Sequence, residues 1–248
     1  MSYPQEVHAA IGGGEHLANA ATQKNYDLGQ RLRLEDNRIY RYAENFDTAL
    51  ITGSLVEGKP YVSGDNDLAV ATAAAVGDTD LSITCTQTTA ADYYAEGWCA
   101  VTKAAAAAAL GQAFQVRTHI VLSAAAVTFY LKANTPVVVA IAAADEVGFT
   151  PCVYKDVVIA ATTLAGMLAG VAHCALPADY FGWLQTGGVG AVKAATSTVL
   201  GNHVDAITAA AGRAGVPDGN GKFPTIGHVM TIASTADECD TVYLTIDN

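Results

Sequence analysis

The chain has 248 residues, with 24 acidic and 13 basic side chains and a formal net charge of −11. Hydrophobic residues make up 51% of it and charged residues 15%, a composition that buries enough apolar surface to exclude intrinsic disorder. An acidic chain without a long basic stripe argues against a nucleic-acid-binding surface. Because charge is sparse and apolar content high, we expect other subunits to cover part of the surface.

The first 25 residues are predicted to form a flexible arm. They contain three consecutive glycines at 12–14 and few large apolar side chains, spaced too irregularly for an amphipathic helix. Such a segment buries too little area alone to offset its ordering entropy, so we expect it to become ordered on a neighbouring subunit. The side chains expected to make that contact are Tyr3, Val7, Ile11 and Leu17. Residues 26–248 are expected to form a β-rich domain, either undivided or in two subdomains.

Residues 31–42 predict a β-hairpin. RLRL (31–34) and RIYRY (38–42) flank Asp36-Asn37, which is typical of a two-residue turn. Such a turn places Leu34 opposite Ile39. One face of the hairpin would then carry Leu32, Leu34, Ile39 and Ala43, and the other Arg31, Arg33, Tyr40 and Tyr42. The face with arginine and tyrosine is either solvated or a contact strip for another subunit.

Further short runs rich in β-branched and aromatic residues predict strands at 81–87, 97–103, 113–122, 127–131, 136–141, 152–160, 225–233 and 241–246. FGWLQTGGVGAV (181–192) predicts two strands around a Gly-Gly turn. Alanine runs, such as 104–109, predict short helical turns in loops and alanine within closely packed strands. No run of βαβ units is found. The predicted fold class is therefore mainly β: an antiparallel sandwich or barrel with short Ala-rich helical turns and an extended N-terminal arm.

The sequence predicts neither a signal peptide nor a membrane span. The N-terminus lacks a basic and an apolar region. The longest uncharged stretch, 157–178, is interrupted by Gly166, Gly170, His173 and Pro177, so we expect buried strands and a turn there. The cysteines are too far apart for a CxxC pair and are expected to be small buried hydrophobic residues. They are Cys85, Cys99, Cys152, Cys174 and Cys239.

No catalytic constellation is found in the sequence. Gly188-Val189-Gly190 is only a fragment of a dinucleotide fingerprint, and the histidines form neither HxH nor HExxH. His173 and Cys174 are neighbours on a predicted strand, so they point to opposite faces and cannot form a catalytic pair with each other. The acidic loops at 64–67 and 218–221 lack the glutamate of a calcium loop and are predicted to be turns. We therefore expect no catalytic residue, metal or cofactor.

The order of several segments is similar to that in virion structural proteins of tailed bacteriophages. DLGQRLRLEDNRIYRYAENF followed by DTALITGSLV (27–56) resembles the opening of those proteins, and so does the later GVAHCALPADYFGWLQTGG (170–188). TTAADYYAEGWCAVTK (88–103), GQAFQVRTH (111–119), VYKDVVIA (153–160) and the C-terminal IGHVMTIA and DTVYLTI fit the same set. The resemblance covers residues 26–248 in order; the alanines after Lys103 depart from a loop that is usually Gly-rich.

The resemblance implies a head decoration, or cement, protein of the virion, made in the host cytoplasm. It implies a non-enzymatic protein that binds the outer surface of the capsid and stabilises the shell by bridging subunits of the major capsid protein, commonly as a homotrimer. Its partners would be the major capsid protein and other copies of itself, with no nucleic acid and no membrane. The alternative is a head fibre or adhesin that binds host glycans, for which the candidate aromatics are Trp98, Trp183, Tyr93 and Tyr94.

Overall fold

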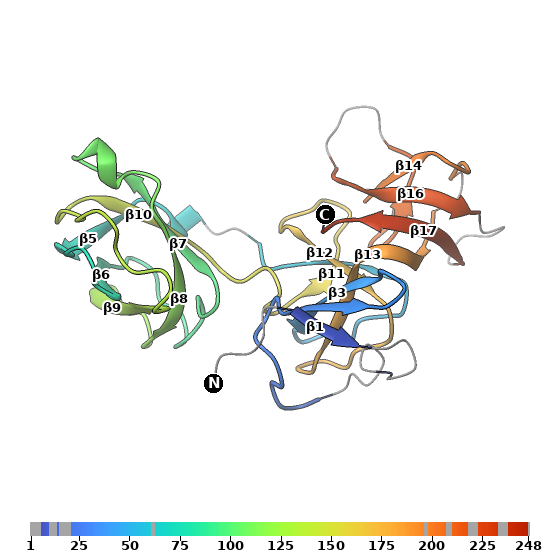
Figure 1. The fold of residues 1–248 in the computed structure, drawn as a ribbon, viewed down its shortest axis with the longest axis horizontal. Helices are drawn as coiled ribbons and strands as arrows, with labels where there is room; N and C mark the ends of the chain where they lie inside the picture. The colour runs from blue at the N-terminus through green and yellow to red at the C-terminus, as the bar shows by residue number, and fades with distance from the viewer. Residues whose placement is uncertain are drawn as a thin grey trace. The chain divides into compact units, whose positions relative to one another are not determined.

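The computed structural model describes residues 6–9, 14, 21–60, 63–195, 198–206, 210–217, 223–232 and 238–247. Strands make up 47% and helix 2%, which confirms the predicted mainly-β class. The chain forms two compact units (Figure 1). The split unit consists of Met1–Pro60 and Val153–Asn248, and the inserted unit of Tyr61–Cys152.

The inserted unit is a closed antiparallel barrel in the order β10-β5-β6-β9-β8-β7. Alternate side chains along each strand point inward, and among them the rings of Phe129 and Phe149 stack with their centroids 4.3 Å apart. Closure pairs both edges of every strand. The strands are β5 (Leu68–Thr72), β6 (Asp80–Thr84), β7 (Trp98–Lys103), β8 (Ala113–His119), β9 (Ala126–Leu131) and β10 (Glu146–Thr150).

Two short 3₁₀ turns and one irregular segment accompany the barrel strands. Ala107–Ala109 forms a single 3₁₀ turn, a short helical turn of the kind predicted for the alanine run; a second 3₁₀ turn covers Ser63–Asp65. The prediction of a strand at 136–141 is wrong. Within this range the structure has no regular strand and a single isolated bridge, from Ile141 to Ala74. Val137 and Ile141 hydrogen-bond the backbone of residues 74–78, and between them Oε1 of Gln112 accepts the backbone N–H groups of Val138 and Val139, each at 2.9 Å.

The split unit contains a branched sheet of eleven strands in its described residues. One path runs β1-β2-β3-β13-β17-β16-β14-β15, and β11-β4-β12 joins it at β13. The first of these strands are β1 (Glu6–Ala9), β2 (Arg31–Leu34), β3 (Ile39–Glu44), β4 (Leu55–Glu57), β11 (Val158–Ile159) and β12 (Leu168–Ala172). The others are β13 (Phe181–Lys193), β14 (His203–Ala206), β15 (Ala214–Gly215), β16 (Thr225–Thr231) and β17 (Cys239–Thr245).

The branch point, β13, is one continuous strand, so the prediction of two strands around a Gly-Gly turn is wrong. Its first half pairs with β3 and its second half with β17, and Gly187 pairs with both, opposite Ile39 and Thr245. The register to β3 shifts between Gln185 and Gly187, which marks a β-bulge. Gly188 follows with a φ of 76°, a conformation that favours glycine. The two glycines therefore bend the strand without ending it.

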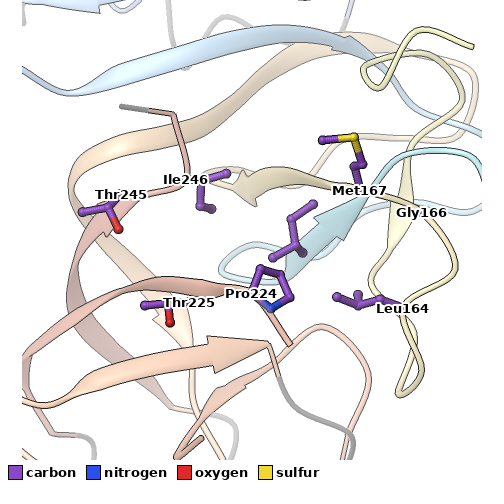
Figure 2. Close-up of a pocket in the computed structure, with 8 residues that line it drawn as sticks. Leu164, Gly166, Met167, Pro224, Thr225, Thr245 and Ile246 are labelled. Atoms are coloured by element: carbon purple, nitrogen blue, oxygen red, sulfur yellow. The ribbon is translucent and has the colours of Figure 1, made fainter. Parts of the chain in front are cut away.

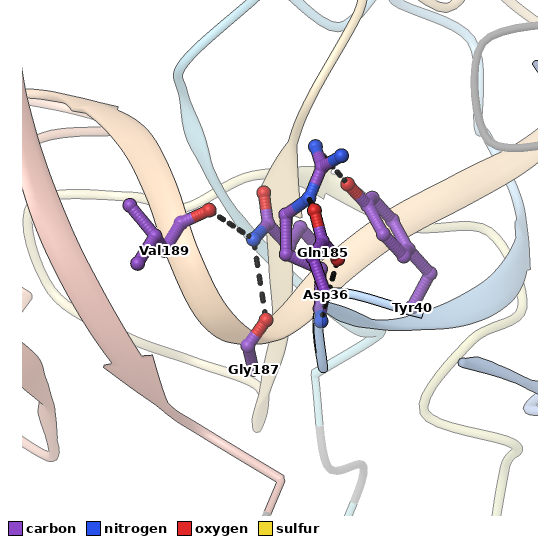
Figure 3. Close-up of polar contacts among 6 residues, drawn as sticks. Asp36, Tyr40, Gln185, Gly187 and Val189 are labelled. Atoms are coloured by element: carbon purple, nitrogen blue, oxygen red, sulfur yellow. Dashed lines mark hydrogen bonds and ion pairs between the residues drawn. The ribbon is translucent and has the colours of Figure 1, made fainter. Parts of the chain in front are cut away.

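The side chain of Gln185 completes this bulge. It is buried, and its Nε2 donates to the carbonyl oxygens of Gly187 at 3.2 Å and Val189 at 2.9 Å (Figure 3). A Cβ on Gly190 would lie only 2.9 Å from Oε1 of Gln185, so glycine at this position leaves room for the amide. The bulge thus depends on a side-chain amide that stands in for backbone pairing.

The hairpin at β2 and β3 is present, but its predicted register is wrong by one residue. Arg33 lies opposite Ile39, and Leu32 opposite Tyr40. The turn has three residues instead of two, because Asn37 adopts a φ of 67° and donates its N–H to the carbonyl of Leu34 at 3.0 Å. This is the usual three-residue hairpin loop that ends in a left-handed residue.

A one-residue shift moves every side chain of a strand to the other face. Tyr40 and Tyr42 accordingly lie inside the split unit, 0% and 2% exposed, instead of sharing an outer face with Arg31 and Arg33. The predicted face of arginine and tyrosine therefore does not exist. Leu32, which we expected on the opposite side from the tyrosines, packs on their side of the sheet.

The described part of the predicted arm includes a strand. Glu6–Ala9 pairs in parallel with β2, and Val7 lies opposite Leu32. Four residues of the arm thus cover the edge of the chain's own sheet, where we had expected contact with a neighbour. The other three predicted contact residues of the arm, Tyr3, Ile11 and Leu17, lie outside the described residues.

The uncharged stretch 157–178 contains β11, β12 and connecting loops, which confirms the interpretation as strands and turns. No helix among the described residues has the length and apolar character required to span a membrane.

Replacing Gln185 by alanine tests the role assigned to its amide in the bulge. Gln185→Ala leaves the carbonyls of Gly187 and Val189 without this donor, so we expect the free energy of unfolding to fall by about 1–3 kcal/mol. Urea unfolding followed by circular dichroism measures the change. The exposed Gln23 is the matched control, and Gln23→Ala should change stability by less than about 0.5 kcal/mol. Equal effects of the two substitutions would contradict the assignment.

Candidate functional site

The two arginines predicted as subunit contacts lie on β2, between β1 and β3. Arg33 is exposed, and its Nη2 donates to Oδ1 of Asn37 at 2.6 Å. Arg31 is half-buried and lies opposite Arg41. Contact of Arg31 and Arg33 with another subunit stays a prediction.

Tyr42 belongs to an aromatic cluster of the split unit. Its ring centroid lies 5.2 Å from that of Tyr26, 5.0 Å from that of Trp183 and 6.1 Å from that of Phe181. These rings join the segment before β2 to β3 and β13. The burial of Tyr42 and Trp183 indicates a packing role for both.

Tyr40 lies near the turn of the hairpin, where the Arg38 side chain hydrogen-bonds both Asp36 and Tyr40 (Figure 3). Nε of Arg38 donates to Asp36 at 2.6 Å and Nη1 donates to the Tyr40 hydroxyl at 3.1 Å. Desolvation by itself raises the pKa of Asp36, but hydrogen bonds from Arg38 outweigh it and the pKa is lowered. Burial raises the pKa of Tyr40 to about 12, so its hydroxyl stays protonated. The His173 ring packs edge-on against Tyr40, with the ring centroids 5.8 Å apart.

A bidentate ion pair ties the C-terminal segment to β3. Nε and Nη2 of Arg41 donate to the two carboxylate oxygens of Asp247 at 2.6 and 3.0 Å, and Nη1 donates to the Gly29 carbonyl at 2.8 Å. Hydrogen bonding to Arg41 lowers the pKa of Asp247. This geometry is the strong form of an arginine–carboxylate contact.

The loop at 64–67 is structural, as its composition predicted. Asp65 is buried beside the barrel core, where its Oδ1 accepts hydrogen bonds from the Tyr94 hydroxyl and from Nε2 of Gln87. Burial raises the pKa of Asp65 despite these bonds, and burial likewise raises that of Tyr94. Nε2 of the buried His119 accepts the Tyr94 backbone N–H at 3.0 Å. Asp65, Tyr94 and His119 are thus buried and joined by hydrogen bonds. The other acidic loop, 218–221, lies outside the described residues.

The five cysteines differ in burial, and three of them have a raised pKa. Cys85, Cys99 and Cys152 are buried, as predicted, whereas Cys174 is half-buried and Cys239 is exposed, which corrects the expectation for these two. Burial raises the pKa of Cys85 to about 11 and also raises that of Cys99 and Cys239. A raised pKa disfavours the thiolate, the reactive form.

One pocket of about 300 Å³ opens on the split unit (Figure 2). Beside it, the buried Glu57 builds the loop at 160–166 by accepting backbone N–H groups of Ala161, Ala165 and Gly166 at 2.8 to 3.0 Å. Leucine, proline and isoleucine dominate the lining, with two threonine hydroxyls as its side-chain polar groups. The lining residues are Leu164, Gly166, Met167, Leu168, Pro224, Thr225, Thr245 and Ile246. Such a lining can contact an apolar group.

The most distinctive surface feature is a row of exposed side chains that crosses four strands of the split unit. Val189 on β13 lies opposite Tyr243 on β17, Tyr243 lies opposite His228 on β16, and His228 lies opposite His203 on β14. Residues directly opposite in a sheet share a face. All four are exposed, with Val189 at 42% and Tyr243 at 49%. We call these four residues the outer row.

The opposite face of the same strands packs the core. Val192, Val204, Val229 and Val242 are buried together. Next to the outer row, exposed Ala191 lies opposite Thr241, and exposed Met230 sits at a bulge in β16. The solvent face of this half of the sheet thus presents small, apolar and aromatic side chains where alternation usually places charged ones. Sequence reasoning missed it, because β16 and β17 were predicted without their pairing.

No known protein family, curated protein or solved structure matches the chain. Among the described residues, no group of three or more His, Cys, Asp or Glu side chains is placed to hold a metal ion.

The ion pair between Arg41 and Asp247 predicts a pH dependence of stability. Since the folded-state pKa of Asp247 is lowered below the unfolded value of about 3.9, its contribution is present above that value and lost as pH falls through the folded pKa. Asp247→Asn should therefore lose less unfolding free energy than the wild type between about pH 5 and pH 2. Urea titrations across that range measure the difference, and parallel curves for the two proteins would contradict the prediction.

Proposed function

We propose that the protein is a non-enzymatic virion structural protein of a tailed bacteriophage, which binds the outer surface of the capsid and stabilises the shell by bridging major capsid protein subunits. The outer row and its surroundings carry this proposal, together with the resemblance of residues 26–248 to such proteins. We further propose that it acts as a homotrimer, because closed symmetry satisfies identical contact surfaces without leaving one unpaired.

The outer row supports a protein-binding role on physical grounds. Val189 and Tyr243 expose large apolar surface side by side, and Met230 adds a third exposed apolar group near them. Tyrosine and methionine are enriched at protein interfaces, and adjoining apolar groups on a rigid sheet bind without a large ordering cost. The net charge of −11 suits the outside of a shell, because the inside faces DNA phosphates.

A glycan-binding role is the second candidate, and one residue favours it. Trp98 is 47% exposed on β7, where Gln115 and Thr150 lie opposite it on the two adjacent strands. An exposed indole beside polar side chains can stack on a sugar ring. The other candidate aromatics support this role less, because Trp183 and Tyr94 are buried and Tyr93 packs on Tyr94 with ring centroids 4.9 Å apart.

Co-sedimentation with empty capsids of the phage, prepared without this protein, tests the main proposal. We expect the wild type to pellet with capsids and the double variant Val189→Ser/Tyr243→Ser to bind at least about tenfold more weakly, since central aromatic contacts dominate interface energy. The control Val76→Ser/Val138→Ser removes two still more exposed apolar groups, 66% and 69%, from the inserted unit and should bind as the wild type does.

Two outcomes would contradict the proposal: no pelleting of the wild type, or equal loss in the outer-row variant and the control. Retention of the wild type on a glycan array, abolished by Trp98→Ala, would support the second candidate instead.

A further inference from the structure

We infer that His203 and His228 form a two-histidine binding site for a divalent transition metal ion of the kind that prefers imidazole, namely Cu²⁺, Ni²⁺ or Zn²⁺. The inference rests on the pairing of β14 with β16 and is independent of the proposed function. It assigns a ligand to the histidines of the outer row, whereas the proposed function rests on its apolar side chains.

The register brings the two imidazoles together. His203 and His228 lie directly opposite each other on adjacent antiparallel strands. Both are exposed, while the next pair, Val204 and Gly227, is buried, so the two histidines point to the same outer side of the sheet. Their separation in sequence hides this relation, which only the strand pairing shows.

The backbone around His203 is held in place. The N–H of Val229 donates to the carbonyl of Asn202 at 2.9 Å, and the N–H of Gly201 donates to the carbonyl of Val229 at 2.9 Å. These bonds fix the end of β14 against β16 beside the histidine pair. Little rearrangement is therefore needed on binding, and preorganised ligands lose less entropy.

The expected spacing suits chelation. Opposed residues of an antiparallel pair have Cβ atoms about 4.5–5.5 Å apart, and a metal–nitrogen bond is about 2.0–2.1 Å long. Two imidazole rings that lean toward each other over that spacing can place one nitrogen each on a single ion. Two ligands on one ion bind more tightly than either alone, because the second bond forms within the same molecule.

The donor set indicates which ions bind. Imidazole suits copper, nickel and zinc, and the general order of affinity places Cu²⁺ above Ni²⁺ and Zn²⁺. Mg²⁺ and Ca²⁺ prefer oxygen ligands and should not bind. The neighbour of His228 on its other side is Tyr243, and the described residues supply no third His, Cys, Asp or Glu ligand.

Metal titration of the full chain tests the site. After removal of bound metal with a chelator, the protein is titrated at pH 7.5 with CuCl₂, NiCl₂, ZnCl₂ or MgCl₂ by isothermal calorimetry. We expect one equivalent of Cu²⁺ to bind most tightly and Mg²⁺ not to bind. His203→Gln and His228→Gln should each weaken Cu²⁺ binding at least tenfold, because each removes one of the two ligands.

His8→Gln is the matched control, since His8 is exposed on a strand but lies opposite Arg33. This variant should keep the wild-type affinity. A second measurement is the thermal midpoint, which Cu²⁺ should raise in the wild type and in His8→Gln but not in the two site variants, because a ligand stabilises the state that binds it. Wild-type affinity in both site variants, or an equal loss in His8→Gln, would overturn the inference.

Discussion

The bulge in β13 is the constraint on which the split unit depends. On one side of Gly187 the strand pairs with β3 and β12, and on the other with β17, so every branch of the sheet meets at this strand. A strand that bends here must release backbone carbonyls from regular pairing. The buried amide of Gln185 donates to two of them, and glycine at 190 leaves space for that amide. The hairpin of β2 and β3 and the outer row both take their register from pairing with this strand.

In the split unit, the register of the strands, more than composition, determines which side chains are exposed. In the hairpin, one extra turn residue moves Tyr40 and Tyr42 into the interior, so aromatic groups that could have met a partner pack the chain itself. In β13, β17, β16 and β14, the pairing leaves a valine, a tyrosine and two histidines outside in one line. In the inserted unit, by contrast, the buried Asp65 accepts a hydrogen bond from the Tyr94 hydroxyl, and the buried Asp145 accepts backbone N–H groups of Ala105 and Ala142.

Local patterns in the sequence predicted much of the fold and little of this surface. Alternation identified the strands at 98–103, 113–119 and 225–231 because each has a buried and an exposed side. Asp36-Asn37 and Gly187-Gly188 were misjudged because the same residues serve two-residue turns, left-handed positions and bulges, and only tertiary pairing distinguishes them. The irregular backbone at 136–141 depends on the distant amide of Gln112. The outer row draws on four strands, so no local window contains it.

Interstrand nuclear Overhauser effects between backbone protons test the register of β17 most directly. In isotopically labelled full-length protein, residue 243 should show cross-strand contacts to residue 189 on one side and residue 228 on the other, with residue 203 opposite 228. That result is required for Val189, Tyr243, His228 and His203 to share one exposed face. Contacts displaced by one residue on either side of β17 would turn Tyr243 away from Val189 or from His228 and contradict the account.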